Sequence, residues 1–251
     1  LAGVNSINWA RIVAQVVYYF VAGAALGSPH RPVSFVVPTG NFGDVLAGFV
    51  AKRMGLTVDR LVIATNVNDI LARTLASGRY EVTGVVPSSS PSMDIQVSSN
   101  FERVLFEALD RDAGALRGLM AALNQSGAFS PSNRALEAIR ADFDAGRTDE
   151  AQTAETIARV RREAGYLLDP HSAVAVSVAE RIQHDPRVPQ VVLGTAHPAK
   201  FPDAVERACG ERPALPPHLA DLMEREERTP TLPNDIAAIE AYISRHARAA
   251  E

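Results

Sequence analysis

Short apolar runs and helix-spaced apolar stripes alternate along the chain. Runs rich in β-branched and aromatic residues, bounded by proline, glycine or polar residues, predict buried strands at 33–37, 61–66 and 190–195. Stripes of apolar residues at spacings of three and four predict helices around these strands. The order helix–strand–helix–strand–helix predicts an α/β fold, in which right-handed crossovers join a parallel sheet flanked by helices.

The first predicted helix is the most hydrophobic. Either Asn5 or Ser6 is expected to cap it, and its interior runs from Ile12 to Leu26. Because this segment is apolar nearly all round, we expect it to be buried inside a larger body. Its longest apolar run, Val16 to Leu26, is too short for a membrane span.

Breaks in the pattern suggest how the chain is divided. Residues 85–92 are rich in proline and serine and predict a long loop. Residues 100–162 predict helices interrupted at Gly114, at 127–131 and at Gly146. We therefore expect residues 1–97 to belong to an α/β domain, 98–165 to form a helical insertion, 166–210 to return to the α/β domain, and 211–251 to form a C-terminal helical tail.

Composition narrows the function classes. With 251 residues, 47% hydrophobic and 22% charged, the chain is typical of a globular protein. Its net charge of −4 gives no reason to expect nucleic acid or an anionic membrane as a partner. The single cysteine, Cys209, excludes an intramolecular disulfide, and no signal peptide is visible, so we expect a reducing, cytoplasmic location.

The turn after the first strand carries candidate chemistry. Gly40 and Gly43 lie between the strand and a predicted helix that begins near Val45. Main-chain N–H groups at such a turn, together with the helix N-terminus, favour an anion, most often phosphate. The motif lacks the lysine and hydroxyl of a P-loop and the spacing of a dinucleotide fingerprint. The glycines alone are equally consistent with a tight connection that binds nothing.

The other strand ends carry small polar groups. Thr39, the pair Thr65–Asn66 and Thr195 each follow a predicted strand, and in a parallel sheet such ends converge. Hydroxyl and amide groups without a carboxylate pair favour positioning of a cofactor over acid–base hydrolysis. His171 and His197 flank the same ends, and no histidines have metal-ligand spacing. Lys200 is a candidate amine, although a lysine near a helix start is commonly solvated.

Five motifs together resemble threonine synthases of the bacterial and fungal type. They occur in the order of that family and cover the chain to about Phe201: Asn5–Arg11, Pro38–Asp44, Ser98–Arg103, Asp169–Ser172 and Gly194–Phe201. The resemblance implies a pyridoxal phosphate lyase of the tryptophan-synthase-like fold, fold type II. Such an enzyme converts O-phospho-L-homoserine and water to L-threonine and phosphate by γ-elimination and β-addition.

The resemblance also implies roles for particular residues. The cofactor phosphate would be bound by Gly40, Asn41, Phe42, Gly43 and Asp44, and the pyridine nitrogen would face Thr195. Neighbours of cofactor or substrate would be Asn5, Ser6, Thr39, His171 and His197. The expected ligands are therefore pyridoxal 5′-phosphate and a small phosphorylated substrate, with no metal, nucleic acid or membrane.

One part of the family pattern has no match. The lysine that forms the Schiff base lies in a Ser-Phe-Lys-Asp segment upstream of all the motifs above, and neither Lys52 nor Lys200 matches it. The catalytic residue is therefore unknown, and we expect a C-terminal portion that binds the cofactor weakly and does not turn over alone. A non-catalytic module for pyridoxal phosphate or a phosphorylated metabolite, or a related β-synthase or dehydratase, stays open.

Overall fold

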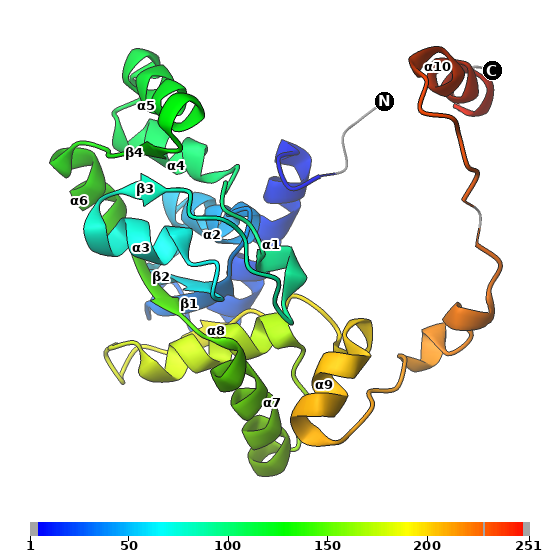
Figure 1. The fold of residues 1–251 in the computed structure, drawn as a ribbon. Coiled ribbons are helices and arrows are strands. Elements are labelled where there is room, and N and C mark those ends of the chain that lie inside the picture. The colour runs from blue at the N-terminus through cyan, green and yellow to red at the C-terminus, as the bar shows by residue number, and fades with distance from the viewer. Residues whose placement is uncertain (1–4, 228, 248–251) are drawn as a thin grey trace. The chain divides into compact units, whose positions relative to one another are not determined.

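The computed structural model describes residues 5–227 and 229–247. The chain separates into two compact units, Leu1–Pro213 and Ala214–Glu251. Figure 1 shows the order of the elements along the chain. No helix in the described part is long and apolar enough to cross a membrane.

A four-stranded parallel sheet lies at the centre of the first unit. Its strands are β1 (Val33–Pro38), β2 (Val58–Thr65), β5 (Phe143–Arg147) and β6 (Gln190–Val192), in the order β5–β2–β1–β6. The three predicted strands and the parallel arrangement are confirmed. The last predicted strand is shorter than expected, because β6 ends at Val192, and it is half-buried at the sheet edge.

Alternate residues of the strands face two different cores. Phe35 and Leu61 pack on one face against α1 (Trp9–Ala25) and α2 (Gly43–Arg53). Val36 and Val62 point to the other face, where they pack against α8. This helix, Pro170–Arg181, begins at Asp169, whose carboxylate accepts from the main-chain N–H groups of the first turn. Both faces of the sheet are covered, as a parallel sheet requires.

Close contact between α1 and α2 depends on a glycine. A Cβ at Gly48 would lie 2.6 Å from the Tyr19 ring and 2.8 Å from Leu61. Tyr19 is fully buried and donates to the main-chain carbonyl of Asp44 at 2.8 Å. The absence of a side chain at position 48 therefore allows α1 to lie against the sheet and to contact the start of α2.

Two expectations for α1 are wrong. The helix begins at Trp9 and is capped by Asn8, whose side chain accepts from the Ala10 N–H, rather than by Asn5 or Ser6. It is also not buried all round. Only one side packs on the core, and Val17 and Val21 on the opposite side are more than half exposed.

The region expected to be helical contains strands. Its helices are α4 (Phe101–Ala108), α5 (Ala113–Ser126), α6 (Asn133–Asp142) and α7 (Glu150–Ala164). The sequence Phe-Asp-Ala-Gly-Arg at 143–147, where only a break was expected, forms β5 and pairs with β2. A short strand, β4 (Ala128–Phe129), pairs with β3 (Tyr80–Glu81). The division of the chain at 97, 165 and 210 stays a prediction, with β5 assigned to the sheet.

The remaining helices follow the sequence pattern. They are α3 (Ile70–Ser77) and α9 (Pro202–Cys209) in the first unit, and α10 (Ile236–His246) in the second. Asp235 caps α10 through the Ala238 N–H. The long loop after β3 contains one 3₁₀ turn at Pro91–Met93.

Candidate functional site

The turn between β1 and α2 is shaped by an aromatic side chain in an unusual conformation. Phe42 has a left-handed backbone (φ 64°, ψ 9°), which costs a non-glycine residue roughly 1–2 kcal/mol. The residue is 1% exposed, and its ring centroid lies 5.4 Å from that of Phe101 and 5.5 Å from that of Phe143. Burial of a Phe side chain contributes roughly 1.5–3 kcal/mol, so packing holds the turn in this shape.

The turn leaves its main-chain donors free. In the described part of the chain, the N–H groups of Gly40, Asn41, Phe42 and Gly43 donate to no protein acceptor. The carbonyl groups, in contrast, are engaged: Asn100 donates to the Asn41 carbonyl at 2.8 Å. Free N–H groups at the start of α2 form the arrangement that binds an anion.

A small cavity of about 150 Å³ adjoins this turn. It is lined by the turn and the residues beside it, by two residues of α1 and by Ser6, which precedes α1: Ser6, Arg11, Gln15, Pro38, Thr39, Gly40, Asn41, Phe42, Gly43, Asp44 and Val45. Arg11 and Gln15, four residues apart on α1, place a cation and an amide beside the free N–H groups. The structure thus brings Ser6 and residues 39–44 together, as the sequence suggested.

Asp44 is the acidic group of this cavity. Tyr19 donates to its carboxylate Oδ1 at 3.2 Å as well as to its main-chain carbonyl. Burial raises the pKa of Asp44 to about 6, and the Tyr19 hydrogen bond opposes this rise. Burial, followed by the charge of Asp44, also raises the pKa of Tyr19 well above its usual value.

A second cavity of about 160 Å³ lies at the same ends of the strands and shares Pro38 and Gly40 with the first. Its other lining residues are Ser92, Met93, His171, Thr195, Ala196, Lys200 and Phe201. A Cβ at Gly40 would lie 2.5 Å from the Ser92 carbonyl oxygen, so glycine is required there. At Gly43 the nearest atom would be 3.5 Å away, which is an ordinary contact.

His171 is held in one tautomer beside this cavity. The Ser92 N–H donates to its Nε2 at 3.3 Å, so its proton is on Nδ1, 2.9 Å from Asp169 Oδ1. The Phe201 ring lies 4.8 Å from the imidazole. The histidine is buried and connects α8 to the loop that contains Ser92.

The loop at 84–96 forms a wall of this cavity and is tied to the end of β2. Asn66 donates to Ser88 Oγ, Ser90 Oγ and Asp94 Oδ1 at 2.8, 3.0 and 2.8 Å. Asn68 donates to Asp94 Oδ1 at 2.9 Å and to the Val86 carbonyl, and its Oδ1 accepts from the Val86 N–H. Asn66 is fully buried, so these bonds replace water at the strand end.

The side chains of several expected neighbours make local hydrogen bonds. Asn5 accepts from the Ile7 N–H, and His197 accepts from the Ala199 N–H; neither side chain lines the two cavities. The Thr39 hydroxyl donates to the Val37 carbonyl at 2.7 Å. Asn100 occupies the N-cap position of α4 without a side-chain cap hydrogen bond, and its amide group donates to the Ser6 and Asn41 carbonyls.

Sequence reasoning missed Arg11, Gln15, Ser92 and Asp169 as parts of the site. Arg11 and Asp169 lie inside motifs that were recognised, but spacing alone did not show which cavity they approach. For Arg11 and Gln15 the i, i+4 spacing on a helix next to the turn was an available signal.

Solved structures place this architecture among known folds. The chain superposes on a pyridoxal-phosphate-bound threonine synthase from Brucella melitensis with a TM-score of 0.94 and 60% sequence identity, covering 99% of this chain and 53% of that one. For the yeast threonine synthase the TM-score is 0.86 at 38% identity, covering 96% and 52%. The chain has the fold of pyridoxal phosphate enzymes of fold type II, as predicted.

Sequence comparison narrows this class further. A family profile described as "Threonine synthase, C-terminal" matches residues 172–243. The chain is 53% identical to threonine synthase from Pseudomonas aeruginosa over 98% of its own length and 53% of that protein, and 43% identical to the Saccharomyces cerevisiae protein over 88% and 48%. The chain therefore corresponds in sequence and fold to the C-terminal portion of threonine synthases. It spans about half the length of these relatives.

Proposed function

We propose that this chain supplies the cofactor-binding half of a threonine synthase, which converts O-phospho-L-homoserine and water to L-threonine and phosphate. The free N–H groups of Gly40 to Gly43 carry this proposal, because they form a main-chain anion site at the carboxyl end of a parallel sheet. The family correspondence supports pyridoxal 5′-phosphate as the ligand and lyase chemistry in threonine biosynthesis as the activity.

The residues present fit the phosphate and the ring of this cofactor. Four main-chain donors and Arg11 suit a phosphate group, and Gly40 leaves room between the two cavities. Thr195 lies on the wall of the second cavity, so its hydroxyl would meet the pyridine nitrogen without enforcing the full protonation that a carboxylate would. When bound, the cofactor would act as an electron sink for loss of the γ-phosphate.

The chain's own side chains would hold and shape this site. His171 fixes the loop wall through the Ser92 N–H, and Asp169 fixes the imidazole in turn. Asp44 would hold a proton below a pH of about 6, which reduces repulsion of a bound phosphate. We assign Thr39 and Ser6 to the substrate side of the turn, with Asn5 and His197 as more distant neighbours.

The amine needed for Schiff-base exchange is not assigned to this chain. Lys52 forms an ion pair with Asp142 at 2.8 Å, and Lys200 is an exposed residue at the edge of the second cavity. We therefore expect cofactor binding without turnover by these 251 residues alone. A cytoplasmic location and the absence of nucleic-acid and membrane partners also stay predictions.

Binding of pyridoxal phosphate to the purified chain tests the proposal. Equilibrium dialysis should show saturable binding, and Gly40→Ala should weaken it at least tenfold, because its methyl group meets the Ser92 carbonyl. Gly118→Ala, at an open position on α5, is the matched control and should leave binding unchanged. Equal binding by both variants, or no saturable binding by the natural chain, would contradict the proposal.

A phosphate-release assay separates this proposal from a non-catalytic module. The chain with pyridoxal phosphate and O-phospho-L-homoserine should release no phosphate by itself, and release should appear when the N-terminal half of a threonine synthase is added. If cofactor binding is intact and no addition restores phosphate release, the binding-module alternative is favoured.

A further inference from the structure

The cavity beside the turn 39–44 contains two charged side chains that do not pair with each other. Arg11 lies on α1, and Asp44 lies in the first turn of α2. The Arg11 side chain has no ion pair or hydrogen bond with any residue that the structure describes, and the Asp44 side chain accepts only from Tyr19 among those residues. A cation and an acid that share a cavity without pairing predict a ligand that contacts both.

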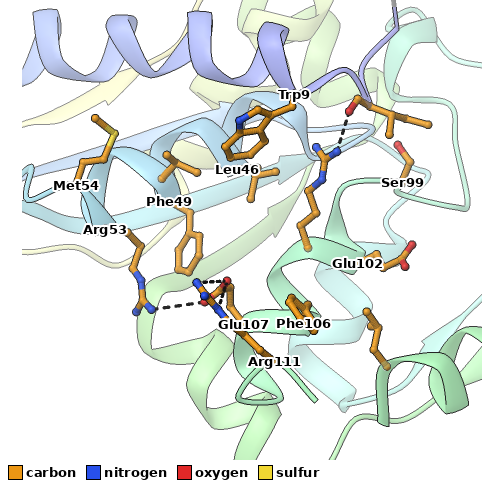
Figure 2. Close-up of a pocket in the computed structure, with 14 residues that line it drawn as sticks. Trp9, Leu46, Phe49, Arg53, Met54, Ser99, Glu102, Phe106, Glu107 and Arg111 are labelled. Atoms are coloured by element: carbon orange, nitrogen blue, oxygen red, sulfur yellow. Dashed lines mark hydrogen bonds and ion pairs between the residues drawn. The ribbon is translucent and has the colours of Figure 1, made fainter. Parts of the chain in front are cut away.

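The arginines of a larger cavity are arranged differently. This cavity of about 700 Å³ lies among α1, α2, α4 and α5, and apolar side chains such as Leu46 and Phe106 line it (Figure 2). Its Arg53 and Arg111 both pair with Glu107, at 3.6 and 3.0 Å. Because these charges are already compensated, they attract an added anion weakly. Of the two cavities, the one at the turn is therefore better suited to an anionic group.

The direction of the Tyr19 hydrogen bond shows which oxygen of Asp44 is free. The phenol hydroxyl donates to Oδ1 at 3.2 Å and to the main-chain carbonyl at 2.8 Å, so Oδ1 acts as an acceptor. Burial raises the pKa of Tyr19 well above its usual value, so this hydroxyl keeps its proton. A proton bound by Asp44 is therefore on Oδ2, the oxygen that accepts from none of the described residues.

A phosphate group that carries one hydrogen matches these donors and acceptors. Its other oxygens can accept from the main-chain N–H groups of residues 40–43 and from Arg11, and its P–OH group can donate to Asp44 Oδ2. Sulfate has the same tetrahedral shape and carries no hydrogen at neutral pH. It would present a negative oxygen to the carboxylate, with no donor between them.

We propose that Asp44 selects phosphate over sulfate by sharing one proton between its Oδ2 and a phosphate oxygen. The identity of the ester, pyridoxal phosphate, rests on the proposed function, whereas the anion site follows from the free N–H groups. Burial raises the pKa of Asp44 to about 6, which is close to the second pKa of a phosphate ester, about 6, so the two acids hold a common proton readily.

The other charged and titratable groups beside this pair are both on α1. Arg11 stays cationic and Tyr19 stays neutral near neutral pH, so Asp44 and the phosphate are the groups that change protonation there. Above a pH of about 6 the free carboxylate and the free ester have both lost the proton that the complex holds. Binding then takes up a proton, and the affinity for an ester falls as the pH rises, by up to about tenfold per pH unit.

Titration with inorganic anions tests the selection without cofactor. The ¹⁵N-labelled chain is titrated at pH 8 with phosphate or with sulfate at constant ionic strength, and NMR follows the amide signals of Gly40, Asn41 and Gly43. At this pH both anions carry mainly two negative charges, and phosphate has one hydrogen more. Phosphate should bind at least about tenfold more tightly. In Asp44→Asn, whose side-chain amide can donate to either anion, the preference should fall below about threefold.

Asp112→Asn is the matched control. It makes the same substitution at the N-cap of α5, where asparagine can also accept from the main-chain N–H groups of Gly114 and Ala115. This variant should keep the preference of the natural chain. Equal affinities for the two anions in the natural chain, an unchanged preference in Asp44→Asn, or no shift of the three amide signals with either anion would each overturn the inference. The first and third of these results need no variant, so they decide the matter even if Asp44→Asn folds poorly.

Equilibrium dialysis of pyridoxal phosphate separates this inference from the proposed function. The natural chain should bind the cofactor at least about fivefold more weakly at pH 8 than at pH 7, and Asp44→Asn should change by less than about twofold. The pyridoxal groups ionise in the same way with both proteins, so the comparison isolates Asp44. Saturable binding with equal affinity at both pH values would overturn the inference and leave the proposed function standing. A preference for phosphate over sulfate without any cofactor binding would overturn the proposed function and support the selection by Asp44.

Discussion

The two walls of the candidate site are held in place by opposite kinds of interaction. The turn 39–44 is fixed from behind by the buried Phe42 ring, and its N–H groups stay free. The loop 84–96 is held by hydrogen bonds that join its Asp94 to Asn66 and Asn68 at the end of β2 and to the Ser88 N–H of the loop itself. Apolar packing thus fixes the turn 39–44, which is the binding wall, whereas side-chain hydrogen bonds fix the loop 84–96, which is the supporting wall.

Replacement of Phe42 should have the largest effect on this contrast. Phe42→Ala removes a buried ring and should lower the free energy of unfolding by about 3–5 kcal/mol. Phe42→Gly loses the same ring but relieves the left-handed conformation, so it should be more stable than Phe42→Ala by about 1 kcal/mol. Urea unfolding of both variants measures the difference. If Phe42→Gly is less stable than Phe42→Ala, as is usual for glycine at ordinary positions, the left-handed conformation of residue 42 does not carry the expected strain.

Replacement of Asn66 tests the supporting wall. Asn66→Ala leaves the buried hydroxyl of Ser90 and the Asp94 carboxylate short of a donor, which should cost about 2–3 kcal/mol of unfolding free energy. Amide hydrogen exchange should accelerate in residues 84–96 before it does in the turn 39–44. Asn124→Ala, on the exposed side of α5, is the control and should change stability by less than about 0.5 kcal/mol. Uniform acceleration across both walls would show that they are not separate units.

The smallest expected effect is a pH dependence at the turn. Because burial raises the pKa of Asp44 from 3.8 to about 6, the folded chain holds this proton more tightly than the unfolded chain. The resulting contribution to stability is complete below pH 3.8 and is lost as the pH rises through about 6. Asp44→Asn, which stays neutral, should therefore match the natural chain near pH 4 and exceed its stability by about 1–3 kcal/mol at pH 8.

Thermal unfolding from pH 4 to pH 8 measures this difference, and Asp94→Asn provides the comparison in the other wall. A constant difference between Asp44→Asn and the natural chain over this range would contradict the assigned pKa.

Much of the fold followed from local pattern. The strands at 33–38 and 58–65 contain mainly apolar, often β-branched runs at 33–37 and 61–64, and burial on both faces gives such runs their composition. Strand β5 was missed because Phe143 is its only large apolar residue, and its place in the sheet comes from pairing with β2. The outer side of α1 was expected to be buried because its residues are apolar. The hydrophobic pattern alone does not show which element would cover them.

The candidate site was predictable where it lies in one segment. The turn 39–44 could be recognised from two glycines between a strand and a helix, and its free N–H groups agree with that interpretation. Ser92 reaches the second cavity only through packing of its loop, which no local spacing encodes, whereas the i, i+4 spacing of Arg11 and Gln15 offered a signal that they share one side of a helix. Asn5 and His197 lie in recognised motifs, yet their side chains are used in local turns.

Gly48 connects the interior of the sheet to the ligand-facing turn. A methyl group at this position would push the Tyr19 ring outward, and Tyr19 is the side chain that grips the Asp44 carbonyl at the start of α2. One added carbon atom on the buried side of α2 would therefore displace the turn 39–44 through the Tyr19 hydrogen bond. The glycine thus sets the spacing of α1 and α2 and, through the Tyr19 hydrogen bond, the position of the first residues of α2.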